Sequence, residues 1–218
     1  GRSFENLEFT KRLLKNPEQH QCHTCDIRNS EEIKKALENV SSLYALIANA
    51  GVGGENQYGD QDRWQEVVDT NLTGTYQTIQ ECLPLIKKNS APFKKIIIIS
   101  SILARLGVPG YSAYCASKAG LLGLTRSLAA EHSGDGILVN ALCPGWVDTD
   151  MAQEGLQGFA DALNVSKNEA YKEAMKPVPL GKMSQPEEVA KLVAFLISEE
   201  QSSISGQTID INNGALMP

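Results

Sequence analysis

The sequence predicts an α/β protein whose helices pack on a mainly parallel β-sheet, and three observations lead to this fold class. Segments with helical periodicity alternate with short apolar segments along the whole chain. Residues 95–101 are rich in β-branched side chains and hardly alternate with polar ones, which is typical of a strand buried on both faces. The 218 residues suffice for one sizeable core, so a single domain over residues 1–218 is expected.

The first elements follow from local apolar patterns and caps. Residues 3–15 are expected to form a helix with an apolar side. Residues 20–25 are expected to form a strand, and Ser30 is expected to cap a helix that runs to about residue 39. A short apolar strand over residues 43–48 then ends in Asn49-Ala50-Gly51, which marks a turn.

The middle of the chain carries the longest predicted helices. Residues 60–88 keep apolar side chains at helical spacing. After the buried strand, residues 112–132 are expected to form a helix whose alanines and glycines permit close packing. A strand over residues 137–143 is stopped by Pro144-Gly145.

The last part of the chain continues the alternation. Short helices are expected around residues 151–163 and 166–175. Pro186 stands at the first turn of a helix, and the two glutamates behind it suit the positive end of the helix dipole. Residues 207–211 form the last predicted strand.

The composition argues against several kinds of protein. Apolar residues make up 42% and charged residues 21%, which is ordinary for a globular protein. The net charge of -6, without a basic block, argues against nucleic-acid binding, and no apolar run is long enough to cross a membrane. Five cysteines, an odd number, favour a reducing compartment, so the cytoplasm is the expected location.

Cys22 and Cys25 raise the question of a metal or redox site. Residues three apart in a strand point to opposite faces of a sheet. No second pair of Cys or His residues completes a zinc site. We therefore expect both cysteines to be structural, and we predict no metal site.

Tyr114 and Lys118 are the first residues that indicate chemistry. Residues four apart lie on one face of a helix, so a lysine there can lower the pKa of the phenol and hold a cofactor ribose. Ser101 ends a predicted strand 13 residues (114 − 101) before Tyr114. A serine at a strand end is usually structural, and a Tyr-Lys pair also arises by chance, so only the set indicates a redox site.

Further residues complete an ordered set, and this set resembles the classical short-chain dehydrogenase/reductase family, in particular its 3-oxoacyl reductases. The resemblance covers essentially the whole chain. It implies a doubly wound, Rossmann-like parallel sheet in three layers and an NAD(P)-dependent enzyme that acts on a ketone or secondary alcohol. The residues that carry it are Asp26, Asn49-Ala50-Gly51, Asn71-Leu72-Thr73-Gly74, Ser101, Tyr114, Lys118, Asn140, Pro144-Gly145 and Thr149.

The resemblance implies four catalytic residues. Tyr114 would exchange a proton with the substrate oxygen while hydride moves to or from the nicotinamide. Lys118 would lower the pKa of the phenol, ordinarily about 10, and grip the nicotinamide ribose. Ser101 would donate a hydrogen bond to the substrate oxygen. Asn71 would interrupt a long helix, and its backbone carbonyl would hold a water in a relay to the lysine.

The resemblance also assigns the cofactor contacts. Asp26 and Ile27 would meet the adenine, and Tyr114 and Lys118 would meet the nicotinamide ribose. Small residues after a strand would let the cofactor pass close to the backbone. The other implied contacts are Asn49, Ala50, Gly51, Pro144, Gly145, Val147 and Thr149.

Arg2 bears on the choice of cofactor. In this family an acidic residue at the end of the second strand binds the ribose 2′-hydroxyl. Gly1 stands at that place by resemblance, and the neighbouring Arg2 could pair with a 2′-phosphate. The plain alternative is an exposed arginine at a helix start. We therefore predict NADP(H), with NAD(H) as the second choice.

One part of the family pattern has no counterpart in these residues. The family's Thr-Gly-x-x-x-Gly-x-Gly turn holds the pyrophosphate on backbone amides. Gly51-Val52-Gly53-Gly54 imitates that turn, but it has Asn56 at the third glycine position and follows a later strand. The first two strands of the family's sheet would then be missing, which would leave a gap between the third and fourth. We expect the chain to be a fragment of a longer protein.

Residues 149–182 are expected to form a substrate lid. Their apolar side chains could line a pocket for a ketone or acyl chain, such as a 3-oxoacyl thioester, or could pack the lid itself. The resemblance implies a homotetramer that acts on a small molecule. The rival hypothesis is a dinucleotide-sensing or scaffold protein without turnover, which would not need a proton donor. The apolar lid residues are Leu156, Phe159, Leu163, Tyr171 and Met175.

Overall fold

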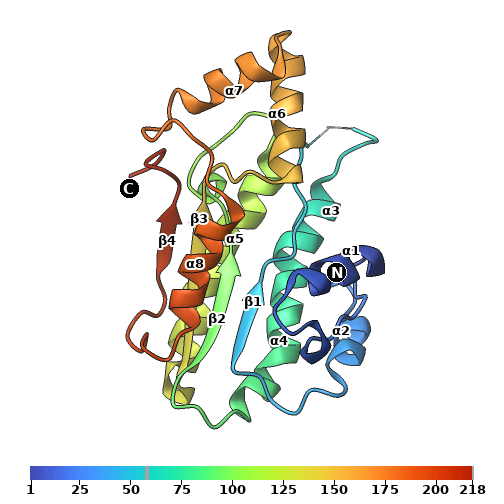
Figure 1. Cartoon of the computed structure of the whole chain (residues 1–218), viewed down its shortest axis with the longest axis vertical. Coiled ribbons are helices and arrows are strands. Elements are labelled where there is room, and N and C mark those ends of the chain that lie inside the picture. Colours follow the sequence, from blue (N-terminus) through green and yellow to red (C-terminus); the bar gives the residue numbers. More distant parts are fainter. Residues whose placement is uncertain (57–58, 218) are drawn as a thin grey trace.

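The fold is a four-stranded parallel β-sheet with helices on both faces (Figure 1). The computed structural model describes residues 1–56 and 59–217. The strands lie in the order β1-β2-β3-β4, which confirms the predicted α/β class and parallel sheet. The elements are α1 (Phe4–Leu13), α2 (Ser30–Leu37), β1 (Ala45–Ala48), α3 (Trp64–Val68), α4 (Gly74–Lys87), β2 (Lys94–Ile99), α5 (Ser112–His132), β3 (Ile137–Pro144), α6 (Asp150–Leu163), α7 (Lys167–Met175), α8 (Pro186–Ile197) and β4 (Thr208–Ile211).

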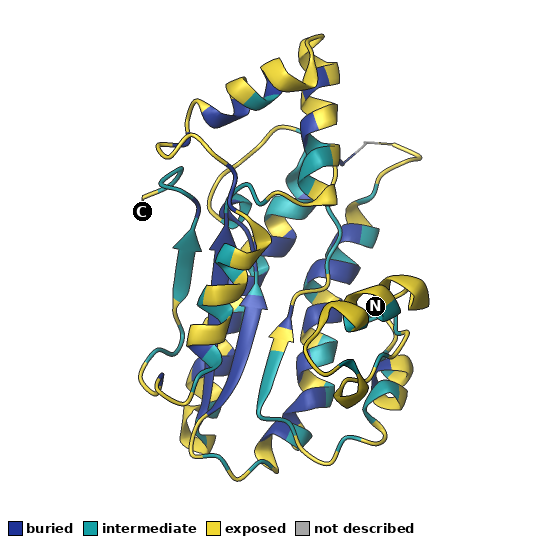
Figure 2. Cartoon of the chain, viewed as in Figure 1, coloured by how far each residue is buried: buried dark blue, intermediate teal, exposed yellow. Residues whose placement is uncertain are grey.

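The central strands are covered on both faces. Ile96 and Ile98 pack against α4 and α5, whereas Ile97 and Leu142 pack against Leu196 of α8. Successive side chains of a strand point to opposite faces, so the isoleucine run serves both cores. This double burial, visible in Figure 2, explains why β2 lacks the alternation of a half-exposed strand.

The long helical stretch before β2 is interrupted at the position that the resemblance implied. A π-helical turn, Asp69–Thr73, separates α3 from α4, and the Gly74 N–H bonds to the Asp69 carbonyl five residues back. The turn contains Asn71. The predicted start at residue 60 was wrong, since α3 begins at Trp64, where the Asp62 side chain accepts a hydrogen bond from the Trp64 N–H.

The prediction of a strand over residues 20–25 was wrong. This segment joins no β-ladder, and the Cys25 N–H bonds instead to the Gly1 carbonyl at 2.8 Å. A strand exists only through its partners, and the sheet has its edge at β1. The expected gap between strands is therefore an open sheet edge, where Ile47 is 39% exposed.

The predicted cap of α2 was wrong by one residue. The side chain of Asn29 accepts a hydrogen bond from the Glu31 N–H, so Asn29 is the N-cap. The Ser30 hydroxyl donates to Glu81 of α4 at 2.7 Å and ties the two helices together.

The α6–α7 pair stands above the carboxyl ends of the strands (Figure 1). Leu156 and Met175 are buried in a cluster between these helices, and Tyr171 packs against it. Phe159 and Leu163 are 37% and 45% exposed. Packing within the pair therefore accounts for three of the five apolar residues that the sequence left open between pocket wall and packing.

Candidate active site

The predicted site residues gather at the carboxyl ends of the strands. Ser101 follows β2, residues 49–51 follow β1, and Pro144 ends β3. The first turns of α5 contribute Tyr114 and Lys118. In open parallel sheets this edge is where ligands bind, because the loops that leave it diverge.

Tyr114 and Lys118 lie side by side on α5. The Lys118 Nζ is 5.6 Å from the centre of the Tyr114 ring and donates a hydrogen bond to the Ile99 carbonyl at 3.0 Å. The Ser100 hydroxyl donates to the Lys118 carbonyl at 2.8 Å. The end of β2 therefore holds both the side chain and the backbone of the lysine.

The pKa shifts of Tyr114 and Lys118 differ from those expected from the sequence. Burial lowers the pKa of Lys118 to about 8, because an ammonium loses its hydration. Burial also raises the pKa of Tyr114, and an interaction with the Ser101 hydroxyl offsets only part of that rise. The predicted lowering of the phenol pKa by Lys118 is not what the structure shows, because burial dominates at both groups.

Asn71 is fully buried and connects three parts of the site. Its amide accepts from the Val52 N–H at 2.8 Å and donates to the Val52 carbonyl at 2.9 Å. It also donates to the Ser117 hydroxyl at 3.2 Å, which in turn donates to the Tyr114 carbonyl at 2.8 Å. The side chain, and not only the backbone predicted from the resemblance, therefore links the loop after β1 to α5.

The space beside Gly51 is narrow. A methyl group built on Gly51 would lie 3.0 Å from the Asn71 Oδ1 and 3.5 Å from the Lys118 Nζ. The structure thus brings residue 51 of the Asn-Ala-Gly turn against two of the predicted catalytic residues. A ligand there would meet bare backbone on one side and the lysine on the other.

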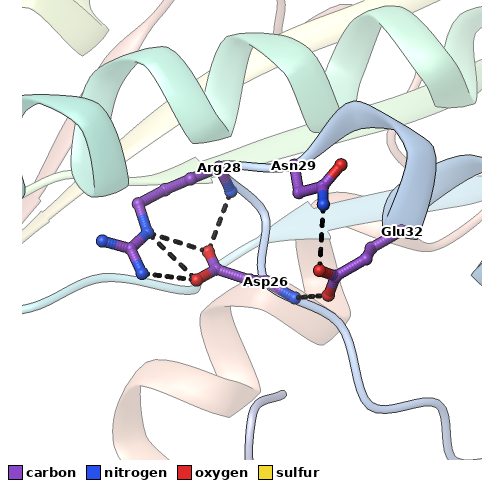
Figure 3. A network of polar contacts seen from close by, with 4 residues as sticks. All are labelled: Asp26, Arg28, Asn29 and Glu32. Atoms are coloured by element: carbon purple, nitrogen blue, oxygen red, sulfur yellow. Dashed lines mark hydrogen bonds and ion pairs between the residues drawn. The ribbon is translucent and has the colours of Figure 1, made fainter.

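At the predicted adenine end, Asp26 is already engaged (Figure 3). Its carboxylate accepts from the Arg28 backbone and guanidinium, with an ion-pair distance of 2.5 Å, and its N–H donates to Glu32 at 2.8 Å. The Arg28 hydrogen bonds lower the pKa of Asp26 to about 2. If the Asp26 carboxylate contacts an adenine, it must do so while it is also bound to Arg28.

Ile27 and Arg2 lie near Asp26. The Ile27 side chain packs on Gly74 at the start of α4, where a methyl group would come within 2.8 Å of it. The positive charge of Arg2 contributes to the lowered pKa values of Asp26 and Glu66, after the larger effects of their hydrogen-bond partners. Arg2 is exposed, which agrees equally with the alternative interpretation of an exposed arginine at a helix start.

The segment after β3 is held by the end of β4 and by Ser184, which precedes α8 (Pro186–Ile197). The Gly145 N–H bonds to the Ile211 carbonyl, and a methyl group on Gly145 would lie 3.0 Å from the Asn212 Cα. Val147 forms a parallel bridge with Ser184. Thr149 caps α6 through its hydroxyl, which accepts from the Ala152 N–H at 3.4 Å. These predicted cofactor residues therefore line one rigid turn.

Sequence reasoning missed several residues of this network. Ser117 and Ser100 are buried and carry the hydrogen bonds that join Asn71, Tyr114 and Lys118. The available signal was their polarity on otherwise apolar elements, next to the catalytic candidates. Among the described residues, no three His, Cys, Asp or Glu side chains are arranged to hold a metal ion.

Comparisons with known proteins identify the family. The profile of the family described as Enoyl-(Acyl carrier protein) reductase matches residues 4–215. The chain is also 36% identical, over its whole length and 85% of the relative, to the 3-oxoacyl-[acyl-carrier-protein] reductase FabG of Rickettsia felis. The chain belongs to the short-chain dehydrogenase/reductase family. A second FabG relative, from Staphylococcus aureus, is 35% identical over 88% of the chain and 75% of that protein.

A solved structure of the short-chain dehydrogenase/reductase fold is similar throughout. It is a single-residue variant of the actinorhodin polyketide ketoreductase with NADPH, at a TM-score of 0.90 and 32% identity, covering 98% of this chain and 85% of that one. Gly51 carries no side chain, and its backbone lies beside Asn71 and Lys118, the residue that the resemblance assigns to the nicotinamide ribose. The glycine-rich pyrophosphate turn of the family does not occur among the 218 residues.

Proposed function

We propose that this chain is an NADPH-dependent carbonyl reductase that converts a ketone to a secondary alcohol. The observation that carries the proposal is the gathering of Ser101, Tyr114 and Lys118 at the end of β2. Asn71 is linked to Tyr114 through Ser117 and lies against the bare backbone of Gly51. A protein that only sensed a dinucleotide would need the cofactor contacts but no proton donor. The family, which includes the FabG relatives, supports the same reaction.

The four residues divide the work. NADPH supplies the hydride that adds to the carbonyl carbon. Tyr114 gives its phenolic proton to the oxygen, and its raised pKa keeps that proton in place near neutral pH. Ser101 donates a hydrogen bond to the oxygen as negative charge develops there. Lys118 holds the ribose, and Asn71 fixes the loop after β1 against α5.

NADP(H) is the preferred cofactor. Arg2 lies near Asp26 and Glu66, at the end of the site where the family places the adenosine ribose, and can pair with a 2′-phosphate. The NADPH-bound ketoreductase and the FabG relatives favour the same choice. Replacing Arg2 with Ala should raise the KM for NADPH and leave that for NADH unchanged. An unchanged KM for NADPH in Arg2→Ala, or a wild-type kcat/KM for NADH comparable to that for NADPH, would count against NADP(H).

The relatives support the proposed substrate class. A 3-oxoacyl thioester is the proposed substrate, since the FabG relatives are 3-oxoacyl-[acyl-carrier-protein] reductases. The whole chain would act as one domain, with residues 149–182 closing over the substrate. Among the described residues, no helix has both the length and the apolar content needed to span a bilayer. We also propose that the protein is a homotetramer and that it works in the cytoplasm, a reducing compartment in which five free cysteines would stay reduced.

The test is NADPH oxidation against a panel of ketones and 3-oxoacyl thioesters. Replacing Tyr114 with Phe should lower kcat by roughly 10²- to 10⁴-fold, the usual contribution of a general acid. Tyr76, which lies on α4 and is 47% exposed, offers the matched control, and Tyr76→Phe should keep full activity. Retained turnover in Tyr114→Phe would overturn the mechanism. No turnover by the wild type, together with measurable NADPH binding, would favour the rival, a sensor or scaffold.

A further inference from the structure

An ion pair joins the loop after Ser101 to the last strand of the sheet. The Arg105 Nη2 lies 3.2 Å from the Asp210 Oδ2 and 3.4 Å from the Thr208 carbonyl oxygen. The two side chains are only 27% and 17% exposed. A pair this sheltered is less screened than a surface pair, and its partners are far apart in the sequence.

The Asp210 end of the pair is rigid. Asp210 belongs to β4 and stands opposite Cys143 of β3 in the parallel register. Its Oδ1 is buried and has no hydrogen-bond partner among the described residues, so the Arg105 guanidinium is the cation that compensates the carboxylate there. Cys143 is fully buried, and β3 lies between β2 and β4 in the sheet. One strand therefore separates Asp210 from the end of β2.

The Arg105 end of the pair is tied to Ser101 by a single 3₁₀ turn, Ile102–Ala104. The Ser101 hydroxyl accepts from the Leu103 N–H at 3.1 Å, and the Ala104 N–H bonds to the Ser101 carbonyl at 3.0 Å. The Arg105 N–H closes the turn on the Ile102 carbonyl at 3.0 Å. Any shift of Arg105 is thus carried through the turn to the Ser101 hydroxyl.

We propose that Arg105 is a positioning residue for Ser101. Its ion pair with Asp210 clamps the turn onto β4, so that the Ser101 hydroxyl stays directed at Tyr114 and at the substrate oxygen. The inference rests on the proposed function, because only the reduction step uses that hydroxyl. Small displacements of a group that stabilises the transition state lower kcat, whereas the affinity for substrate changes little.

The experiment compares steady-state kinetics of Arg105→Met, Arg105→Lys, Asp210→Asn and the Arg105→Met/Asp210→Asn double variant, with NADPH and a 3-oxobutanoyl thioester. Each of Arg105→Met and Asp210→Asn should lower kcat by about fivefold to tenfold, with the KM for thioester and NADPH within about twofold of wild type. The double variant should be no slower than the slower single variant, because both changes break one interaction. Arg105→Lys keeps the charge and should recover most of kcat.

A remote ion pair supplies the control for plain stability. Lys87 and Asp135 pair at 2.8 Å near the amino ends of the strands, away from the site. Lys87→Met breaks a pair whose side chains are 46% and 45% exposed, so it should lower the thermal midpoint less than Arg105→Met and leave kcat unchanged. Wild-type kcat in Arg105→Met, additive losses in the double variant, or a rise in KM alone would overturn the inference. A wild type without turnover of any ketone would instead overturn the proposed function itself, and the inference with it.

Discussion

Lys118→Met should abolish turnover and yet make the protein more stable at neutral pH. The ammonium of Lys118 is fully buried, which lowers its pKa from 10.5 to about 8. That shift corresponds to roughly 3 kcal/mol, since each pKa unit is worth about 1.4 kcal/mol. Methionine removes this cost but also the hydrogen bond to the Ile99 carbonyl, which is worth about 1 kcal/mol. A net stabilisation of about 2 kcal/mol remains.

The pH dependence gives this prediction its sign. Between pH 8 and pH 10.5 the unfolded chain binds a proton on Lys118 that the folded chain has lost, so wild-type stability rises with pH in that window. Below pH 8 the folded protein bears the full cost of the buried charge. The advantage of Lys118→Met should therefore be largest at about pH 7 and shrink towards pH 10.5.

The assay is urea unfolding of both proteins at several pH values and one fixed protein concentration, because assembly would make stability depend on concentration. Lys191→Met, which changes an exposed lysine on α8, controls for the substitution itself and should show no such trend. A Lys118→Met variant that is less stable than wild type at neutral pH would refute the reasoning. A stability difference that stays constant up to pH 10.5 would refute it equally.

Three further predictions follow from the same structure. Asn71→Ala leaves the Val52 N–H and carbonyl unpaired, so the free energy of unfolding should fall by about 2–4 kcal/mol in a urea titration. The control Asn89→Ala removes only a hydrogen bond from the Ala91 N–H and should lower the free energy of unfolding far less. Gly136 has φ 67° and a methyl group there would collide with the Pro92 carbonyl, so Gly136→Ala should lower the thermal midpoint, while Gly134→Ala, with open space around it, should not. Arg28→Gln should return the pKa of Asp26 from about 2 towards 3.8 in an NMR titration. The stability that Asp26 contributes is full above its unfolded pKa and is lost as the pH falls through about 2. The unfolding free energies of the wild type and Arg28→Gln should therefore converge at about pH 2. An unshifted Asp26 titration in Arg28→Gln would show that Arg28 is not the cause.

The sequence predicted most elements but not the contacts that set their limits. The run of isoleucines in β2 and the long helix α5 were recognised because their patterns are local and strong. The strand expected over residues 20–25 failed because a ladder depends on its neighbours, which no local pattern encodes. The cap of α2 was misplaced by one residue, since Asn29 and Ser30 are both good caps and Glu81 of α4 takes the serine.

The candidate site shows a similar division. The order of Asn71, Ser101, Tyr114 and Lys118 indicated the chemistry. The resemblance implied that the helix is interrupted at Asn71, and the structure shows that the interruption is a π-helical turn. The direction of the Tyr114 pKa shift was not predictable, because it depends on how deeply the phenol is buried. The Arg105–Asp210 pair was not predictable either, since it joins segments that only the parallel sheet brings together.

The π-helical turn Asp69–Thr73 interrupts a helix that would be more regular without it, but the interruption places Asn71 in the site. It accommodates one residue more than an α-helix would, so deleting a residue there would let α3 and α4 merge into one continuous helix. The same deletion would rotate the remaining side chains by about 100° and take Asn71 away from Val52 and Ser117. The most regular helix for residues 64–87 would therefore not place Asn71 where the site requires it. Selection for thermal stability alone should tend to remove the irregular turn, and variants that keep activity should keep it.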